Sequence, residues 1–368
     1  MPVSRRLEHG GAPQGPPPQD KSRGLLNRSS DALSGGRLSV VAKTFVFALL
    51  CATSLNPADL LAQDSGCTRR TIAVGVVDGA WNLVPNLGAA NFRGKIHGHN
   101  VQILSSTLDK NPRRIVVLLD TSGSVMDSAK SWETEKAIVA DLIRFAPPEA
   151  SIAQIAFSES VLANEGFAQD RAVLMSNLAA LVTVCEGKRG GPRKTALYDA
   201  IASARDLLGA PNAGDVIFVL SDAADNASQA HEGQVADGLI SAGIRLFAAI
   251  ILTHTPEERA STPEEVDGPP HLRSMVTATG GYLLMMLRGS LQTDPYIPAK
   301  TPADAVNLAV QRLYQQMGEL YRVEVNLPEK PEKPTKWKLE VIDANGEAMR
   351  GVEVHYPQEL TPCANANP

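Results

Sequence analysis

The fold of this chain is decided by the stretch Arg114-Ile-Val-Val-Leu-Leu-Asp-Thr-Ser-Gly-Ser124. Its run Ile115–Leu119 is unbroken and apolar, and it is too short for an ordinary helix. Such a run is typical of a strand buried on both faces, as in a parallel sheet that helices cover on each side. The run ends in the carboxylate of Asp120, and the hydroxyls of Ser122 and Ser124 follow it.

An oxygen-rich loop at the end of a buried strand is a candidate site for a divalent cation. In open α/β sheets, ligands bind just beyond the carboxyl ends of the strands. Hard cations such as Mg²⁺ prefer oxygen ligands. The ordinary alternative for Ser122 and Ser124 is capping of the helix that follows, which is a common use of serine.

The pattern from residue 114 to residue 320 alternates between strands and helices. Short apolar runs predict buried strands at 151–157, 215–222, 245–252 and 282–286, with an antiparallel edge at 162–167. Apolar residues at helical spacing predict helices at 127–145, 171–183, 195–208 and 230–242, a short helix that ends at 279, and a helix that begins at 301. We expect a loop at 253–270, which is acidic and rich in proline. The alternation predicts a doubly wound, mostly parallel α/β sheet.

The spacing Asp-x-Ser-x-Ser behind an apolar strand resembles the first metal-site motif of von Willebrand factor type A domains. The metal-ion-dependent adhesion site of that family also uses a loop threonine and an aspartate that ends another buried strand. Thr195 and Asp222 match those two positions. The resemblance implies a Rossmann-like von Willebrand A fold that binds Mg²⁺, or Mn²⁺ or Ca²⁺. The implied ligands are Asp120, Ser122, Ser124, Thr195 and Asp222.

The resemblance also implies a binding module and not an enzyme. Neutral hydroxyl ligands leave the cation's charge only partly compensated, so a carboxylate from a partner protein can displace a bound water. Members of the family often have glycine where this chain has Lys194 and Ala223, and the added charge of Lys194 can change the ligand preference. Asp225 could bind the metal indirectly, but we favour capping of the helix at 228–242 or solvation.

The segments on both sides of the sheet domain alternate with a period of two, as strands with one buried face do. They resemble a bacterial secreted family labelled the acidobacterial VWFA-related domain, over about residues 70–357. We expect an N-terminal β segment at 64–112, the metal-binding domain at 113–320 and a C-terminal β segment and tail at 321–368. The two β segments should pair as one small module, because isolated hairpins are marginal in water.

The N-terminal residues 1–63 are expected to combine a disordered segment with a signal peptide. Basic residues precede about ten mostly apolar residues, and Ala62 gives a cleavage site, so the signal would span 37–62. An internal helix or a single membrane anchor is the alternative. Export implies a secreted or periplasmic protein without a stable membrane span after cleavage.

The four cysteines are Cys51, Cys67, Cys185 and Cys363, and they form no zinc spacing. Pairing of the β segments would bring Cys67 and Cys363 to the same side, where a disulfide could form. The net charge of −5 gives no basic surface for nucleic acid.

The rival function is that of a haloacid-dehalogenase-like, Mg²⁺-dependent phosphatase with Asp120 as its nucleophile. Asp222 and Asp225 would then hold the cation. That family requires a second carboxylate two residues after the nucleophile, where this chain has Ser122. A serine hydrolase is disfavoured because the chain has no Gly-x-Ser-x-Gly motif.

Overall fold

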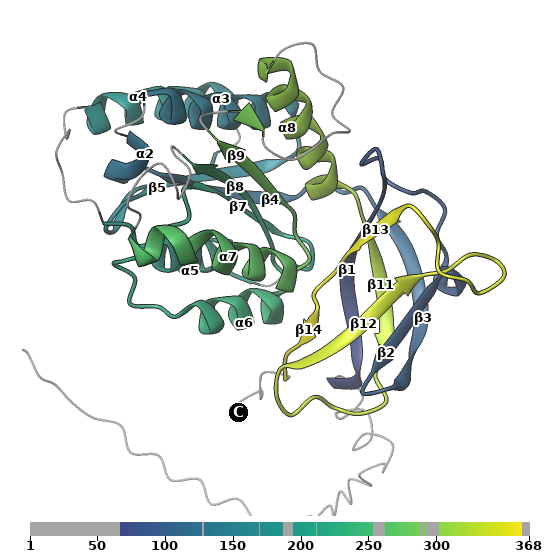
Figure 1. Ribbon diagram of the computed structural model, residues 1–368. Coiled ribbons are helices and arrows are strands. Elements are labelled where there is room, and N and C mark those ends of the chain that lie inside the picture. The colour runs from purple at the N-terminus through teal and green to yellow at the C-terminus, as the bar shows by residue number, and fades with distance from the viewer. Residues whose placement is uncertain are drawn as a thin grey trace, which may run out of the picture. The chain divides into compact units, whose positions relative to one another are not determined.

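The computed structural model describes residues 67–126, 129–168, 170–186, 194–210, 212–252, 262–287, 290–291 and 302–362. The described residues form two sheets of seven strands each, and helices cover both faces of one of them (Figure 1). The signal peptide and disordered segment predicted within residues 1–63 lie outside the described residues. None of the described helices is long and apolar enough to cross a membrane.

The first sheet is the predicted doubly wound sheet, with strand order β10-β9-β8-β7-β4-β5-β6. Its five central strands are parallel: β4 (Arg114–Asp120), β5 (Ser151–Phe157), β7 (Val216–Ser221), β8 (Arg245–Leu252) and β9 (Leu283–Leu287). The edge strands β6 (Val161–Ala168) and β10 (Ser290–Leu291) are antiparallel to their neighbours. The predicted fold class and the predicted antiparallel edge are therefore confirmed.

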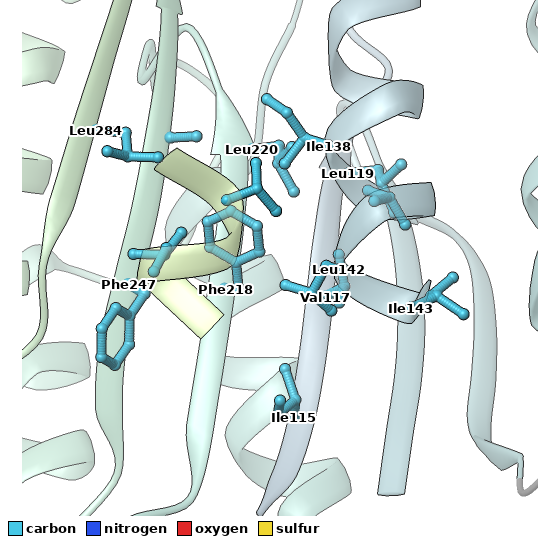
Figure 2. Packing of buried hydrophobic residues seen from close by; sticks show 14 of the residues in the cluster. Ile115, Val117, Leu119, Ile138, Leu142, Ile143, Phe218, Leu220, Phe247 and Leu284 are labelled. Atoms are coloured by element: carbon cyan, nitrogen blue, oxygen red, sulfur yellow. The ribbon is translucent and has the colours of Figure 1, made fainter. Parts of the chain in front are cut away.

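Two hydrophobic cores lie on opposite faces of this sheet. One face packs against α3 (Ala129–Phe145), α4 (Arg171–Glu186) and α8 (Pro302–Gly318). The other packs against α5 (Leu197–Leu208), α6 (Glu232–Ala242) and α7 (Pro263–Ala278). Alternate residues of β4 point into the two cores, as Val117 and Leu118 do (Figure 2 shows the first core). This two-sided burial explains the unbroken apolar run.

The second sheet joins the two flanking segments, as predicted, with strand order β13-β1-β11-β3-β2-β12-β14. The first segment supplies β1 (Arg69–Asp78), the short 3₁₀ helix η1 (Ala89–Asn91), β2 (Phe92–Ile96) and β3 (His99–Asp109). The second supplies β11 (Leu320–Asn326), β12 (Thr335–Val341), β13 (Val352–His355) and β14 (Glu359–Leu360). β11 lies between β1 and β3 and is antiparallel to both. Each segment thus covers strand edges of the other.

Arg70 on β1 links the start of the first chain segment to the end of the second. Its guanidinium donates to the carbonyl oxygens of Cys67 and Thr361, at 3.1 and 3.0 Å. Cys67 is disulfide-bonded. Cys363, the partner that we predicted, lies outside the described residues, so the Cys67–Cys363 pairing stays a prediction.

The predicted loop at 253–270 is wrong in its second half, because α7 already begins at Pro263. Thr262 and Glu265 form a capping box, in which the Thr262 hydroxyl accepts from the Glu265 N–H and the Glu265 carboxylate accepts from the Thr262 N–H. Proline at the first helical position costs no hydrogen bond, so it favours the helix start. The helix then continues through Pro269 and Pro270.

Two other helix starts differ from the prediction by two residues. The helices predicted from residues 195 and 230 begin at Leu197 and Glu232. The helix predicted at 127–145 corresponds to α3, which follows the one-turn helix α2 (Gly123–Met126), and its first two residues lie outside the described residues. Such shifts at helix ends are common, because the terminal turns hold few hydrogen bonds of their own.

Candidate metal centre

The candidate site lies where the winding of the parallel sheet reverses direction. β4 pairs with β5 on one side and with β7 on the other, so the connections that follow these strands run to opposite sides. Such a switch point is the usual place for a ligand in an open α/β sheet. Asp120 is the last residue of β4, and Asp222 directly follows the last residue of β7.

The carboxylate of Asp120 is buried and held by hydrogen bonds on both of its oxygens. Its Oδ1 accepts from the backbone N–H of Ser122 at 2.8 Å, and its Oδ2 accepts from the hydroxyl of Ser221 at 2.5 Å. The Ser221 oxygen in turn accepts from the N–H of Ala223 at 2.9 Å. The sequence prediction gave Ser221 no role. A polar residue at the end of an apolar strand could have indicated that it belongs to the site.

The two serines of the motif lie together beside Asp120. Their hydroxyl oxygens are 3.1 Å apart, and Ser122 is buried. The Ser122 carbonyl accepts from the N–H of Met126, which closes the single turn of α2. The structure therefore brings together Asp120, Ser122 and Ser124, the first three predicted ligands.

Thr195 is buried, and backbone hydrogen bonds tie it to the loop that follows Asp222. Its N–H donates to Oδ1 of Asn226 at 2.8 Å, and its carbonyl accepts from the Asn226 N–H at 3.0 Å. The Thr195 segment and the Asp222 segment are thus one connected unit. The sequence prediction missed Asn226, which carries this connection.

Asp225 caps a helix, but not the helix that we predicted. Its Oδ1 accepts from the N–H of Leu197 at 2.8 Å, at the start of α5, and from the Ser228 hydroxyl at 2.5 Å. Asp225 follows β7, and it can reach α5 because the segment around Thr195, just before α5, lies against the loop that contains Asp225. Asp225 therefore fixes the helix that follows Thr195.

The loop after Asp222 has a strained backbone and packs tightly against helix α7. Ala223 is buried with φ of 71°, a left-handed conformation that costs a non-glycine residue about 1 kcal/mol or more. Helix α7 crosses it so closely that a Cβ on Gly268 would lie 2.1 Å from the Ala223 carbonyl oxygen. The chain has alanine and not glycine at position 223, but the helix that packs against this loop, α7, needs glycine at position 268.

The electrostatics of the site fit a divalent cation. Burial, and after it the negative charge of Asp222, raises the pKa of the Asp120 carboxyl. Burial, and then the charges of Asp120 and Asp222, also raises the pKa of Glu135 on α3. A cation would offset this repulsion. Among the described residues, no group of three or more His, Cys, Asp or Glu side chains is placed to hold a metal, so the donors would be two carboxylates and hydroxyls.

The fold and the geometry of the site define a doubly wound α/β domain with a polar ligand site at its switch point. Residues 115–224 match the family described as von Willebrand factor type A domain. The chain therefore contains a von Willebrand factor type A domain, and domains of this family are generally binding modules without catalytic activity. The match ends just after Asp222 and Ala223 and covers all five predicted ligands.

Similar solved structures have low sequence identity to this chain. A conserved hypothetical protein BatB from Bacteroides thetaiotaomicron is 14% identical, with TM-score 0.40, over 56% of this chain and 98% of its own. A von Willebrand factor type A protein from Catenulispora acidiphila is 13% identical, with TM-score 0.40, over 81% and 74%. Proximal thread matrix protein 1 from the mussel byssus, with a zinc-occupied MIDAS motif, is 15% identical, with TM-score 0.33, over 46% and 49%. No curated protein sequence matches the chain.

Proposed function

We propose that this protein is an extracytoplasmic binding module that captures a protein ligand through a divalent cation. The observation that carries the proposal is the buried Asp120 carboxylate, held beside the Ser122 and Ser124 hydroxyls at the switch point. Asp120, Ser122, Ser124, Thr195 and Asp222 would hold Mg²⁺, or Mn²⁺ or Ca²⁺. These residues would hold the cation, which would supply Lewis-acid attraction for a carboxylate oxygen of the partner.

The residues of the chain hold this site in place before a ligand arrives. Ser221 and the Ser122 N–H fix the orientation of the Asp120 carboxylate. Asn226 fixes the Thr195 backbone. Most donors are neutral hydroxyls, so the cation keeps affinity for a further anionic oxygen. No observation favours the phosphatase alternative, since Ser122 stands where that family needs a carboxylate.

The first prediction is stabilisation by the cation. At about 100 times its dissociation constant, Mg²⁺ or Mn²⁺ should stabilise the fold by about 2.7 kcal/mol, because it binds the folded state only. Asp120→Ala should keep the fold and lose this stabilisation. Thermal unfolding with and without the cation, in the presence and absence of EDTA, measures it.

Asp343→Ala is the matched control for this experiment. Asp343 accepts backbone hydrogen bonds in a turn after β12, in the other sheet, so its loss should leave the cation effect intact. An equal cation-dependent shift in Asp120→Ala and the wild type would show that the site assignment is wrong.

The proposed location outside the cytoplasm rests on the predicted signal peptide and on Cys67. Disulfides persist mainly in oxidising compartments, and Cys67 is disulfide-bonded. The exported protein should begin near Gln63. N-terminal sequencing of the protein from a periplasmic fraction tests this, and an uncleaved N-terminus in the cytosol would contradict it.

A further inference from the structure

Glu135 is a buried carboxylate that the proposed ligand set does not use. Its side chain is 0% exposed, and neither of its carboxylate oxygens has a hydrogen-bond partner among the described residues. It lies on the inner face of α3, one turn before Ile138 and Val139, which belong to the first core. An unpaired carboxylate in an apolar core is costly, so an apolar residue would serve packing better.

The register of α3 on the sheet places Glu135 behind the candidate metal centre. Figure 2 shows Leu142 at the level of Val117, and Ile138 at the level of Leu119. The helix and the strand therefore run in opposite directions. Four residues of the helix, at about 1.5 Å of rise each, cover nearly the same length as two residues of the strand, at about 3.3 Å each. One further turn back along α3 brings Glu135 to the level of Asp120, the end of β4.

The electrostatics agree with this placement. After burial, the charges that raise the pKa of Glu135 are those of Asp120 and Asp222. Glu135 therefore interacts with the two carboxylates of the proposed centre. It is not close enough to form a ligand cluster with them, so its influence is electrostatic.

We propose that Glu135 is a third carboxylate of the cation centre, which compensates the charge of the cation from the helix side without ligating it. This inference rests on the proposed function. With the cation bound, the unpaired Glu135 carboxylate gains an attractive charge. Without the cation, the same carboxylate faces two others across an apolar environment. Glu135 is thus a positioning residue that strengthens the hold on the cation before any partner arrives.

The test uses opposite effects on the cation-free and the cation-bound protein. At pH 8, Glu135→Gln and Glu135→Leu should raise the melting temperature in EDTA, because they remove a repelled carboxylate. The same variants should show a smaller Mg²⁺-dependent shift. Calorimetric titration should give Mg²⁺ affinity weaker by about tenfold or more, since a nearby compensating charge is lost.

Gln154→Leu is the matched control. Gln154 lies on β5, is 1% exposed, and neither polar atom of its amide has a hydrogen-bond partner in the described structure. Its neighbour on β4 is Val117, well before the carboxyl end. Its replacement should change stability equally with and without Mg²⁺ and leave the Mg²⁺ affinity unchanged.

The outcomes separate this inference from the proposed function. The inference alone is overturned if both Glu135 variants keep the Mg²⁺ affinity of the wild type, while Mg²⁺ still raises the melting temperature of the wild type and not that of Asp120→Ala. A change that is equal in EDTA and in Mg²⁺, like that of Gln154→Leu, also overturns it. A wild type that shows no Mg²⁺-dependent shift overturns the proposed function itself.

Discussion

Deletion of residues 64–110 should expose residues 320–360 to proteases. The deletion removes β1 and β3, the two neighbours of β11, so both edges of β11 lose their hydrogen bonds. It also removes β2, the neighbour of β12. The remaining strands would be isolated or paired only at short bridges, and such structure is marginal in water.

Limited proteolysis with mass spectrometry measures this loss of protection. Peptides from β7 and β8 provide the internal control, because these strands pair within the other sheet and should stay protected. We expect cleavage sites in residues 320–360 to change from protected to fully accessible. Equal protection of these residues in the deletion variant and the full chain would show that the two segments do not depend on each other.

Gly268→Ala should destabilise the protein and weaken cation binding together. The new Cβ would lie 2.1 Å from the carbonyl oxygen of Ala223 and 2.7 Å from its carbonyl carbon, so helix or loop must move. Overpacking of this kind costs about 3 kcal/mol. Because Ala223 directly follows Asp222, the movement should displace a proposed ligand. Thermal unfolding and Mg²⁺ titration measure the two effects.

Gly233→Ala is the control for this substitution. Gly233 also lies in a helix, α6, but a Cβ there would have no atom within 4 Å. Alanine should be neutral or stabilise by up to about 1 kcal/mol, because it reduces the freedom of the unfolded chain. If the Gly268→Ala and Gly233→Ala variants unfold at the same temperature, α7 does not approach the Ala223 loop as closely as described.

The strands of the parallel sheet could be predicted because burial on both faces leaves a local signal, an unbroken apolar run. The oxygen-rich loop Asp120–Ser124 was identified for the same reason, since it stands where such a run ends, whereas Thr195 and Asp222 were proposed from the resemblance to von Willebrand factor type A domains. Ser221 and Asn226 were missed because their roles depend on which strands and loops are neighbours. That information is tertiary and is not contained in local spacing.

Glu135 was missed although its position had a helical signal. It precedes Ile138 by three residues, which places it on the same face as the apolar stripe. A charged residue on an apolar face gives no sign by itself of which charges it faces, because those charges come from other strands. The start of α7 was also missed, because Pro263 suggested a loop where the capping box of Thr262 and Glu265 begins a helix.

The second sheet was predicted as a shared module, but its strand order was not. Alternation shows that a strand has one buried face, and it does not tell which strand is its neighbour. The pairing of β11 with both β1 and β3 depends on the inserted domain, which brings Leu320 back beside Asp109.

This arrangement determines the order in which the chain can fold as it emerges, N-terminus first, into the compartment where it folds. The strands β1, β2 and β3 emerge before the inserted domain, and β11 emerges only after it. The parallel sheet can form from residues that are already present, whereas the second sheet must wait for its central strand. Contacts between such distant positions form slowly, and unpaired strands aggregate easily. We therefore expect closure of the second sheet to be the last and slowest folding step, during which β1–β3 are the segment that most needs protection by a chaperone.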